Sequence, residues 1–321
     1  MLYPLKLKPA LKDYLWGGTR LRDEYGKQTE MEKVAESWEV SCHKDGLSVI
    51  ENGEAAGMTL ADYIQKEGRQ ILGTKCQDGT DFPLLIKFID AKGNLSIQVH
   101  PDDDYAQRVE GEPGKTEMWY VMAAEPGAKL IYGFQEEISE EEFRRRIEDN
   151  TLLDICRQVP VHKGDVFFIA SGTLHAVGAG TLICEIQQSS NTTYRVYDYG
   201  RLGADGKPRE LHIAKALEVT RREPLPLTTK PLAQIGLLAD CQISLLAECE
   251  YFTVHHLRLS GEVRMAAPDE SFQAVTMLAG ETEISSEGGS IALCKGESAF
   301  LPAGLGCWQL RGKGELLLSQ A

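Results

Sequence analysis

Residues 163–172 read Lys-Gly-Asp-Val-Phe-Phe-Ile-Ala-Ser-Gly, and residues 295–304 read Lys-Gly-Glu-Ser-Ala-Phe-Leu-Pro-Ala-Gly. Each copy has the pattern of a glycine turn, a short apolar strand and a second glycine turn. Three residues after the second glycine, the first copy has His175 and the second has Cys307. A chance match is the alternative, but the pattern favours a duplicated β-barrel whose second copy has lost a ligand residue.

Short alternating or β-branched runs recur along the rest of the chain and predict an all-β sandwich or barrel. These runs are residues 1–8, 83–90, 95–100, 117–122, 166–169 and 182–187.

Helical signals are few, and the expected helices cover residues 59–66, a small segment at about 138–157, and residues 211–220. The run Arg221–Leu227 contains two prolines and no periodicity, so it reads as a connector. We therefore expect a domain at 1–228 that includes the helical segment, and a second domain at 229–321.

The composition limits the classes of partner and the location. With 34 Lys and Arg against 48 Asp and Glu, the net charge of −14 disfavours binding to nucleic acid or to an anionic membrane. No run approaches the roughly 18 apolar residues of a membrane helix. Eight cysteines without a C-x-x-C pair, and no signal peptide, predict a reduced, cytoplasmic protein. No pattern indicates the oligomeric state.

The segment Ser96-Ile97-Gln98-Val99-His100-Pro101 carries a polar face and an apolar face. Side chains alternate along a strand, so Ser96, Gln98 and His100 share one side. Inside a barrel such polar groups need a partner such as an ion. The segment is therefore a candidate for metal ligation.

Two further segments extend this candidate site. A second predicted strand places Lys115, Glu117 and Trp119 on one face, and His175 follows a glycine turn. His100, Glu117 and His175 form a nitrogen and oxygen ligand set that suits Zn²⁺, although Fe²⁺ or Mn²⁺ also accepts it.

Each residue has a plainer alternative. A histidine before proline is commonly a packing residue, Glu117 could be a surface carboxylate, and His175 could hydrogen-bond a loop. Their joint placement at the ends of predicted strands favours the metal site. The other histidines lack such surroundings and are interpreted as surface or packing residues: His43, His162, His212, His255 and His256.

These segments, in this order, resemble the type I mannose-6-phosphate isomerases, over about residues 1–220. Residues 96–101, Lys115-Thr116-Glu117 and Gly172-x-x-His175 carry the resemblance. Three further motifs support it, namely Trp16-Gly17-Gly18, Ala35-Glu36-Ser37-Trp38-Glu39 and Asn191-Thr192-Thr193-Tyr194-Arg195. The chain resembles the compact bacterial branch, because it has a small helical segment, Gly114 before Lys115 where longer members have histidine, and Asn191 where they have an acidic residue.

The resemblance implies two cupin (jelly-roll) barrels, of which only the first keeps its metal site. It also implies one Zn²⁺ per chain, held by Gln98, His100, Glu117 and His175, and an active-site arginine at Arg195. The implied reaction interconverts mannose 6-phosphate and fructose 6-phosphate through an enediol.

Such a reaction needs a Lewis acid, a base and a phosphate anchor. Lys115 and Arg195 are the candidate cations. Glu185 is the candidate base, with a water ligand of the metal or a purely structural role for Glu185 as alternatives. The expected catalytic residues are thus Arg195, Lys115 and Glu185. The expected contacts to the hexose phosphate are Lys115, Arg195, Ser96, Trp16, Glu36 and Lys87.

Two rival functions remain open. The same barrel with iron would be a dioxygenase, although its uncharged substrate would not need Lys115 and Arg195. A non-catalytic cupin sugar-binding module would need no zinc, so elemental analysis separates it from the isomerase.

Overall fold

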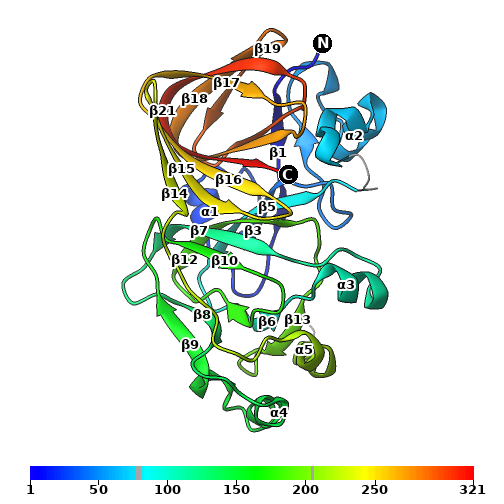
Figure 1. The fold of residues 1–321 in the computed structure, drawn as a ribbon, viewed down its shortest axis with the longest axis vertical. Coiled ribbons are helices and arrows are strands. Elements are labelled where there is room, and N and C mark those ends of the chain that lie inside the picture. The colour runs from blue at the N-terminus through cyan, green and yellow to red at the C-terminus, as the bar shows by residue number, and fades with distance from the viewer. Residues whose placement is uncertain (77–80, 204–205) are drawn as a thin grey trace. The chain divides into compact units, whose positions relative to one another are not determined.

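The computed structural model describes residues 1–76, 81–203 and 206–321. Most of its regular structure is β, as predicted, with five short α-helices among the described residues (Figure 1). In those residues, no helix combines the length and the apolar character needed to cross a bilayer.

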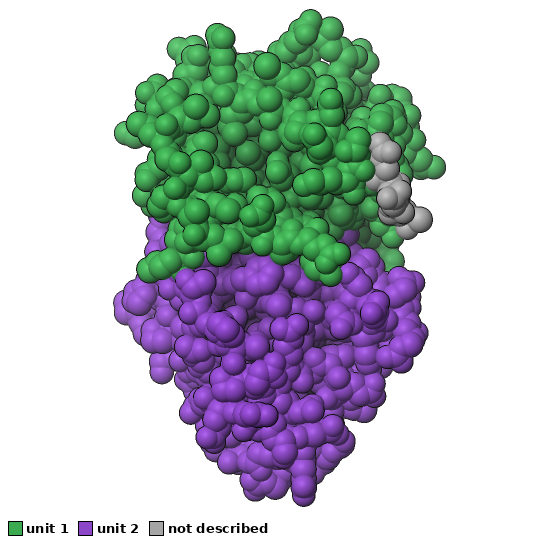
Figure 2. Space-filling view, in the orientation of Figure 1, with its two compact units in different colours: residues 1–12, 19–88, 230–321 green, residues 13–18, 89–229 purple. Residues whose placement is uncertain are grey.

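The chain forms two compact units, coloured separately in Figure 2. Unit 1 comprises Met1–Lys12, Thr19–Phe88 and Lys230–Ala321, and unit 2 comprises Asp13–Gly18 and Ile89–Thr229. The division into domains 1–228 and 229–321 stays a prediction. The compact units differ from it because N-terminal strands pair with C-terminal ones, which no local pattern indicates.

Unit 1 contains a ten-stranded sheet with the order β14-β15-β16-β21-β18-β20-β1-β4, in which β17 adds to β21 and β19 adds to β18. The strands are β1 (Leu5–Lys8), β4 (Val49–Ile50), β14 (Ala233–Leu238), β15 (Cys241–Glu248), β16 (Thr253–Leu259), β17 (Glu262–Ala267), β18 (Gln273–Ser286), β19 (Gly289–Cys294), β20 (Ser298–Leu301) and β21 (Gly306–Gln320). Unit 1 also contains two further paired strands, β2 (Ala10–Lys12) and β3 (Glu36–Val40), and residues 84–88 of the strand β5 (Leu84–Ala91). Its α-helices are α1 (Arg20–Asp23) and α2 (Leu60–Glu67).

Unit 2 contains a five-stranded sheet with the order β13-β6-β11-β8-β9 and a run of three paired strands with the order β10-β7-β12. Its strands are β6 (Ile97–Val99), β7 (Glu117–Ala124), β8 (Lys129–Phe134), β9 (Cys156–Pro160), β10 (Val166–Ile169), β11 (His175–Ala176), β12 (Thr181–Gln188) and β13 (Tyr194–Tyr197). Its helices are α3 (Asp103–Val109), α4 (Glu140–Glu148) and α5 (Ile213–Val219).

The two copies of the sequence repeat have the same local structure. Strand β10 in unit 2 and strand β20 in unit 1 cover equivalent positions of the two decapeptides. The flanking glycines adopt left-handed backbone conformations in both copies, with φ of +91° and +83° at Gly164 and Gly172 and of +89° and +73° at Gly296 and Gly304. The turn-strand-turn interpretation is therefore confirmed. Cys307, the counterpart of His175, is exposed.

All three predicted helices form, and two of them begin at a side-chain N-cap, whereas α5 has none. The Thr59 hydroxyl accepts a hydrogen bond from the amide of Asp62, and the Ser139 hydroxyl accepts one from the amide of Glu142. The predicted end of the helical segment 138–157 is wrong, because Cys156 pairs with Phe134 and begins β9. Long-range strand pairing thus ends the helical segment earlier than its apolar spacing indicates.

Trp308 fills the apolar core of the unit 1 sheet and is 2% exposed. Its indole Nε1 donates to the side-chain oxygen of Gln273 at 3.0 Å. We expect Trp308→Ala to lower the free energy of unfolding by about 3–5 kcal/mol, because the substitution leaves a cavity. Urea denaturation checks this, with Leu202→Ala at a 54% exposed leucine as the control. A loss below about 1 kcal/mol would contradict the packing role of Trp308.

Candidate metal centre and active site

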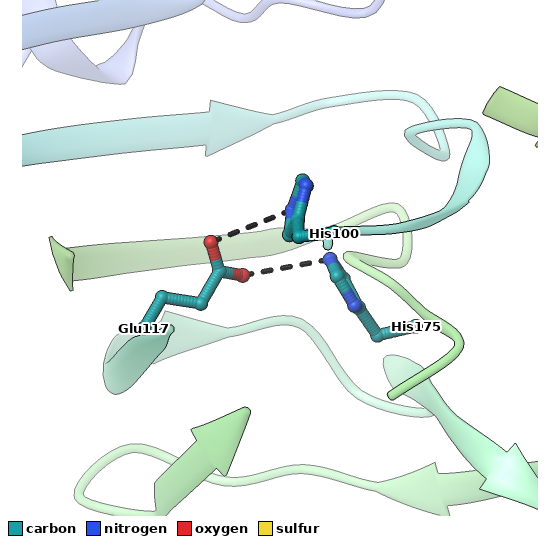
Figure 3. A group of neighbouring side chains, drawn as sticks. All are labelled: His100, Glu117 and His175. Carbon is teal, nitrogen blue, oxygen red and sulfur yellow. Dashed lines mark ion pairs between the residues drawn. The ribbon is translucent and has the colours of Figure 1, made fainter. Parts of the chain in front are cut away.

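Three buried side chains converge in unit 2 (Figure 3). His100 follows β6, Glu117 begins β7 and His175 begins β11. One ligand atom from each residue lies within 4.8 Å of the other two. The Nε2 atoms of His100 and His175 lie 3.6 Å and 3.5 Å from the two carboxylate oxygens of Glu117. Residues from three separate segments thus offer three ligand atoms to one point.

Backbone carbonyls orient both imidazoles. Nδ1 of His100 lies 2.9 Å from the carbonyl oxygen of Thr192, and Nδ1 of His175 lies 2.8 Å from that of Thr173. A carbonyl only accepts hydrogen bonds, so each ring carries a proton on Nδ1, and its Nε2 is the atom that faces Glu117. Burial lowers the pKa of His175 to about 4, which keeps its imidazole neutral near pH 7. Metal-binding histidines commonly have this arrangement.

Lys115 places its ammonium group beside the three converging residues. Its Nζ lies 3.1 Å from Nε2 of His100, forms an ion pair with Glu117 and lies 3.8 Å from a carboxylate oxygen of Glu185. The other carboxylate oxygen of Glu185 accepts a hydrogen bond from the indole of Trp119 at 3.0 Å. Lys115 and Glu185, predicted from separate strands, therefore both border the candidate metal centre.

Gln98 lies between the candidate metal centre and Arg195. On β6 it is paired directly with His175 of β11 on one side and with Arg195 of β13 on the other. Directly opposed residues of neighbouring strands project from the same face of a sheet. The side-chain amide nitrogen of Gln98 lies 3.4 Å from Nε2 of His175. The structure therefore places Gln98 next to the converging residues.

An ionic cluster that no sequence motif predicts lies beside Arg195. Asp198 is 6% exposed and accepts hydrogen bonds from both Arg201 and Arg209, with the Nε atom of Arg209 at 2.7 Å. Burial alone would raise the pKa of Asp198, but the bonds from Arg209 and Arg201 lower it. Burial and the neighbouring charge of Arg209 lower the pKa of Arg195. Arginines 195, 201 and 209 outnumber the two carboxylates near them, Asp198 and Glu210, so this part of the acidic chain is locally positive. In the sequence, only the closeness of the three arginines signals this cluster.

The remaining predicted contact residues lie in both units. In unit 2, Ser96 is buried just before β6, and the carbonyl of the buried Trp16 accepts a hydrogen bond from the Gly93 amide. In unit 1, Nζ of the buried Lys87 lies 4.0 Å from a carboxylate oxygen of Glu36. The role of these four residues in substrate binding stays a prediction.

Comparison with known proteins identifies the family. A model described as the type I phosphomannose isomerase catalytic domain matches residues 4–125, and one described as the mannose-6-phosphate isomerase cupin domain matches residues 242–321. The chain is 40% identical to the probable mannose-6-phosphate isomerase GmuF of Bacillus subtilis, with 99% of each chain covered. It is also 40% identical to the mannose-6-phosphate isomerase of Streptococcus mutans, over 100% of this chain and 99% of the relative. The chain belongs to the type I phosphomannose isomerase family.

The predicted family is thus confirmed, and a solved structure extends the agreement to the fold. The crystal structure of the mannose 6-phosphate isomerase from Bacillus subtilis matches with a TM-score of 0.89 and 37% identity, over 98% of this chain and 99% of that one. Residues 242–321 therefore form a cupin-type domain, and the chain has the overall fold of that mannose 6-phosphate isomerase. The separate arrangement as two barrels stays a prediction.

The residues of this phosphomannose isomerase family member fit a divalent metal. Two imidazoles, each with Nε2 directed at one carboxylate, are a donor set common for Zn²⁺. His100, Glu117 and His175 would hold such an ion, and Gln98 is close enough to His175 to be a fourth ligand.

Proposed function

We propose that the chain is a zinc-dependent aldose-ketose isomerase that interconverts mannose 6-phosphate and fructose 6-phosphate. Relatives named as mannose-6-phosphate isomerases align with it from end to end at 40% identity. The observation that carries the proposal is the convergence of His100, Glu117 and His175 beside the cation of Lys115. We propose a cytoplasmic location as well, on the grounds of its composition.

The isomerisation moves one proton between C2 and C1 of the open-chain sugar through an enediol. Glu185 is the proposed base: its carboxylate takes the proton from C2 of mannose 6-phosphate and returns it to C1. The indole of Trp119 holds one oxygen of Glu185 at 3.0 Å, and this contact would keep the carboxylate in one orientation. The transfer of the hydroxyl proton from O2 to O1 completes the change from aldose to ketose.

The cations act on the charges of the substrate and of the enediol. A bound Zn²⁺ would supply Lewis acidity toward the sugar oxygens. The ammonium group of Lys115, buried at 4% exposure, would stabilise negative charge that develops on these oxygens. Arg195, paired with Gln98 on the next strand, would bind the anionic substrate in the locally positive region around Asp198. Ser96, Trp16, Glu36 and Lys87 are proposed as further contacts.

The direct test is a coupled assay with mannose 6-phosphate before and after chelation. We expect turnover in the purified protein, loss of most of that turnover on removal of the metal, and recovery when Zn²⁺ is added back. Elemental analysis should find about one zinc per chain. Turnover that persists in metal-free protein would contradict metal dependence, and absence of turnover at full zinc content would contradict the isomerase.

The same experiment separates the rival functions. A sugar-binding module would bind the hexose phosphate without converting it. An iron-dependent dioxygenase would contain iron and consume oxygen. The locally positive region and the names of the relatives favour the isomerase over both.

A further inference from the structure

Gln188, the last residue of β12, holds the residue that links Lys115 to Glu117. That residue is Thr116, which immediately precedes β7. The Thr116 amide donates to the side-chain oxygen of Gln188 at 2.8 Å, and the Thr116 carbonyl accepts from the Gln188 amide at 3.1 Å. Gln188 thus restrains the peptide planes on both sides of Thr116, one shared with Lys115 and the other with Glu117.

This contact lies where the ladder between two strands stops. The pairing of β12 with β7 ends at Gln187 opposite Glu117, and the side chain of Gln188 supplies an acceptor to the residue just beyond that end. Both Gln188 and Thr116 are buried, at 6% and 5% exposure. A buried N–H that loses its acceptor is costly, so a change of the Gln188 amide should displace the segment that enters β7.

Asp103, the first residue of α3, fixes the other end of the Gln188 amide. The side-chain nitrogen of Gln188 donates to Oδ1 of Asp103 at 2.9 Å, and the same oxygen accepts from the Gly114 amide at 2.7 Å. A carboxylate accepts hydrogen bonds and a backbone amide donates them, so the nitrogen of Gln188 faces Asp103 and its oxygen faces Thr116. Asp103 therefore orients the Gln188 side chain and holds the start of the same segment.

The backbone of Gln188 also fixes the loop that orients His100. The Gln188 carbonyl accepts from the Ser190 amide at 2.8 Å and from the side-chain nitrogen of Gln187 at 2.7 Å. The buried hydroxyl of Ser190 accepts from the Thr192 amide at 3.2 Å. The Thr192 carbonyl in turn accepts from Nδ1 of His100 at 2.9 Å. Gln188 is thus bonded to two segments that position separate parts of the candidate metal centre.

We propose that Gln188 is a positioning residue for Lys115, Glu117 and His100. It holds these side chains at their observed separations through the segments that carry or orient them. The inference rests on the proposed function, since it concerns the same metal and the same reaction. Nζ of Lys115 lies only 3.1 Å from Nε2 of His100, and a misplacement of about 1 Å can lower a reaction rate about 10²-fold.

The affinity for zinc, measured by competition with a chelator, tests the proposal. Gln188→Met keeps the length of the side chain but loses both hydrogen-bonding groups, and it should weaken zinc binding about 10–100-fold. Gln188→Glu keeps an acceptor for the Thr116 amide and should recover part of that loss. The matched control is Gln135→Met, because the Gln135 side chain donates only to the carbonyls of Asp154 and Cys156, and its zinc affinity should equal that of the parent protein. Unchanged zinc affinity in Gln188→Met, or equal losses in Gln188→Met and Gln188→Glu, would overturn the proposal.

The kinetics at saturating zinc separate positioning from general stability. The turnover number of Gln188→Met should fall about tenfold or more, with a smaller change in KM for mannose 6-phosphate, because the position of Lys115 matters most in the transition state. A residue with only a structural role would change the urea midpoint and leave the turnover number of the folded protein unchanged, and that result would overturn the proposal. A zinc-bound parent protein without turnover would contradict the isomerase but not this inference, which the zinc affinities test on their own.

Discussion

Replacement of His175 by alanine is expected to remove both the zinc and the activity. His175 supplies one of three converging ligand atoms, and its ring is fully buried and oriented by the carbonyl of Thr173. Loss of a ligand that is positioned in this way should reduce the zinc content to near zero. The turnover number should fall by about 10³-fold or more, since Lewis acidity contributes several kcal/mol in metal enzymes. Elemental analysis and the coupled assay measure the two effects on one preparation. His100→Ala should behave in the same way.

The matched control for this prediction is His162→Ala. The side chain of His162 is 82% exposed and belongs to the turn before β10, outside the converging group. This variant should retain its zinc and its turnover. A full zinc complement in His175→Ala would refute its assignment as a ligand, whatever the activity of that variant.

Arg195→Ala is expected to separate catalysis from metal binding. The arginine lies one strand beyond Gln98 and is no part of the three-residue ligand group, so its loss should leave the zinc content unchanged. Turnover with mannose 6-phosphate should fall by about 10²–10³-fold, the size of effect found when one charge-stabilising donor is removed. Steady-state kinetics and elemental analysis on the same sample check both parts.

Two further variants sharpen the Arg195 prediction. Arg195→Lys keeps the positive charge but loses the planar fork of the guanidinium, so it should recover only part of the activity. Arg146→Ala removes an arginine from α4 that is paired with Glu142, and it should have normal kinetics. Normal turnover in Arg195→Ala would exclude a catalytic role for this residue.

The strands of the site could be predicted from local alternation. The runs 95–100, 117–122, 166–169 and 182–187 all contain strands, and β10 has the predicted bounds. These predictions hold because side chains alternate along any extended backbone, irrespective of its neighbours. Helices α1 and α3 were not predicted. Asp102, whose side chain caps α3 by accepting from the Tyr105 amide, was the available signal for the second.

The partners of the site residues could not be predicted in the same way. The bond from His100 to the Thr192 carbonyl and the ionic cluster at Asp198 join residues from separate segments. No periodic pattern in the sequence indicates either the bond to Thr192 or the ionic cluster. The family resemblance implied Arg195, and although Arg201 and Arg209 are close to it in the sequence, their shared partner Asp198 is shown only by the tertiary contacts.

The sequence by itself determined which residues have ligand chemistry, where short strands and glycine turns occur, and that one turn-strand-turn unit appears twice. These properties depend on backbone conformations and side-chain types that act over a few residues. Only the tertiary structure decided that His100, Glu117 and His175 meet, and that β1 pairs with β20 at the opposite end of the chain. Long-range strand pairing sets both, because the hydrogen bonds of a sheet join whichever strands the packing of the whole chain brings together.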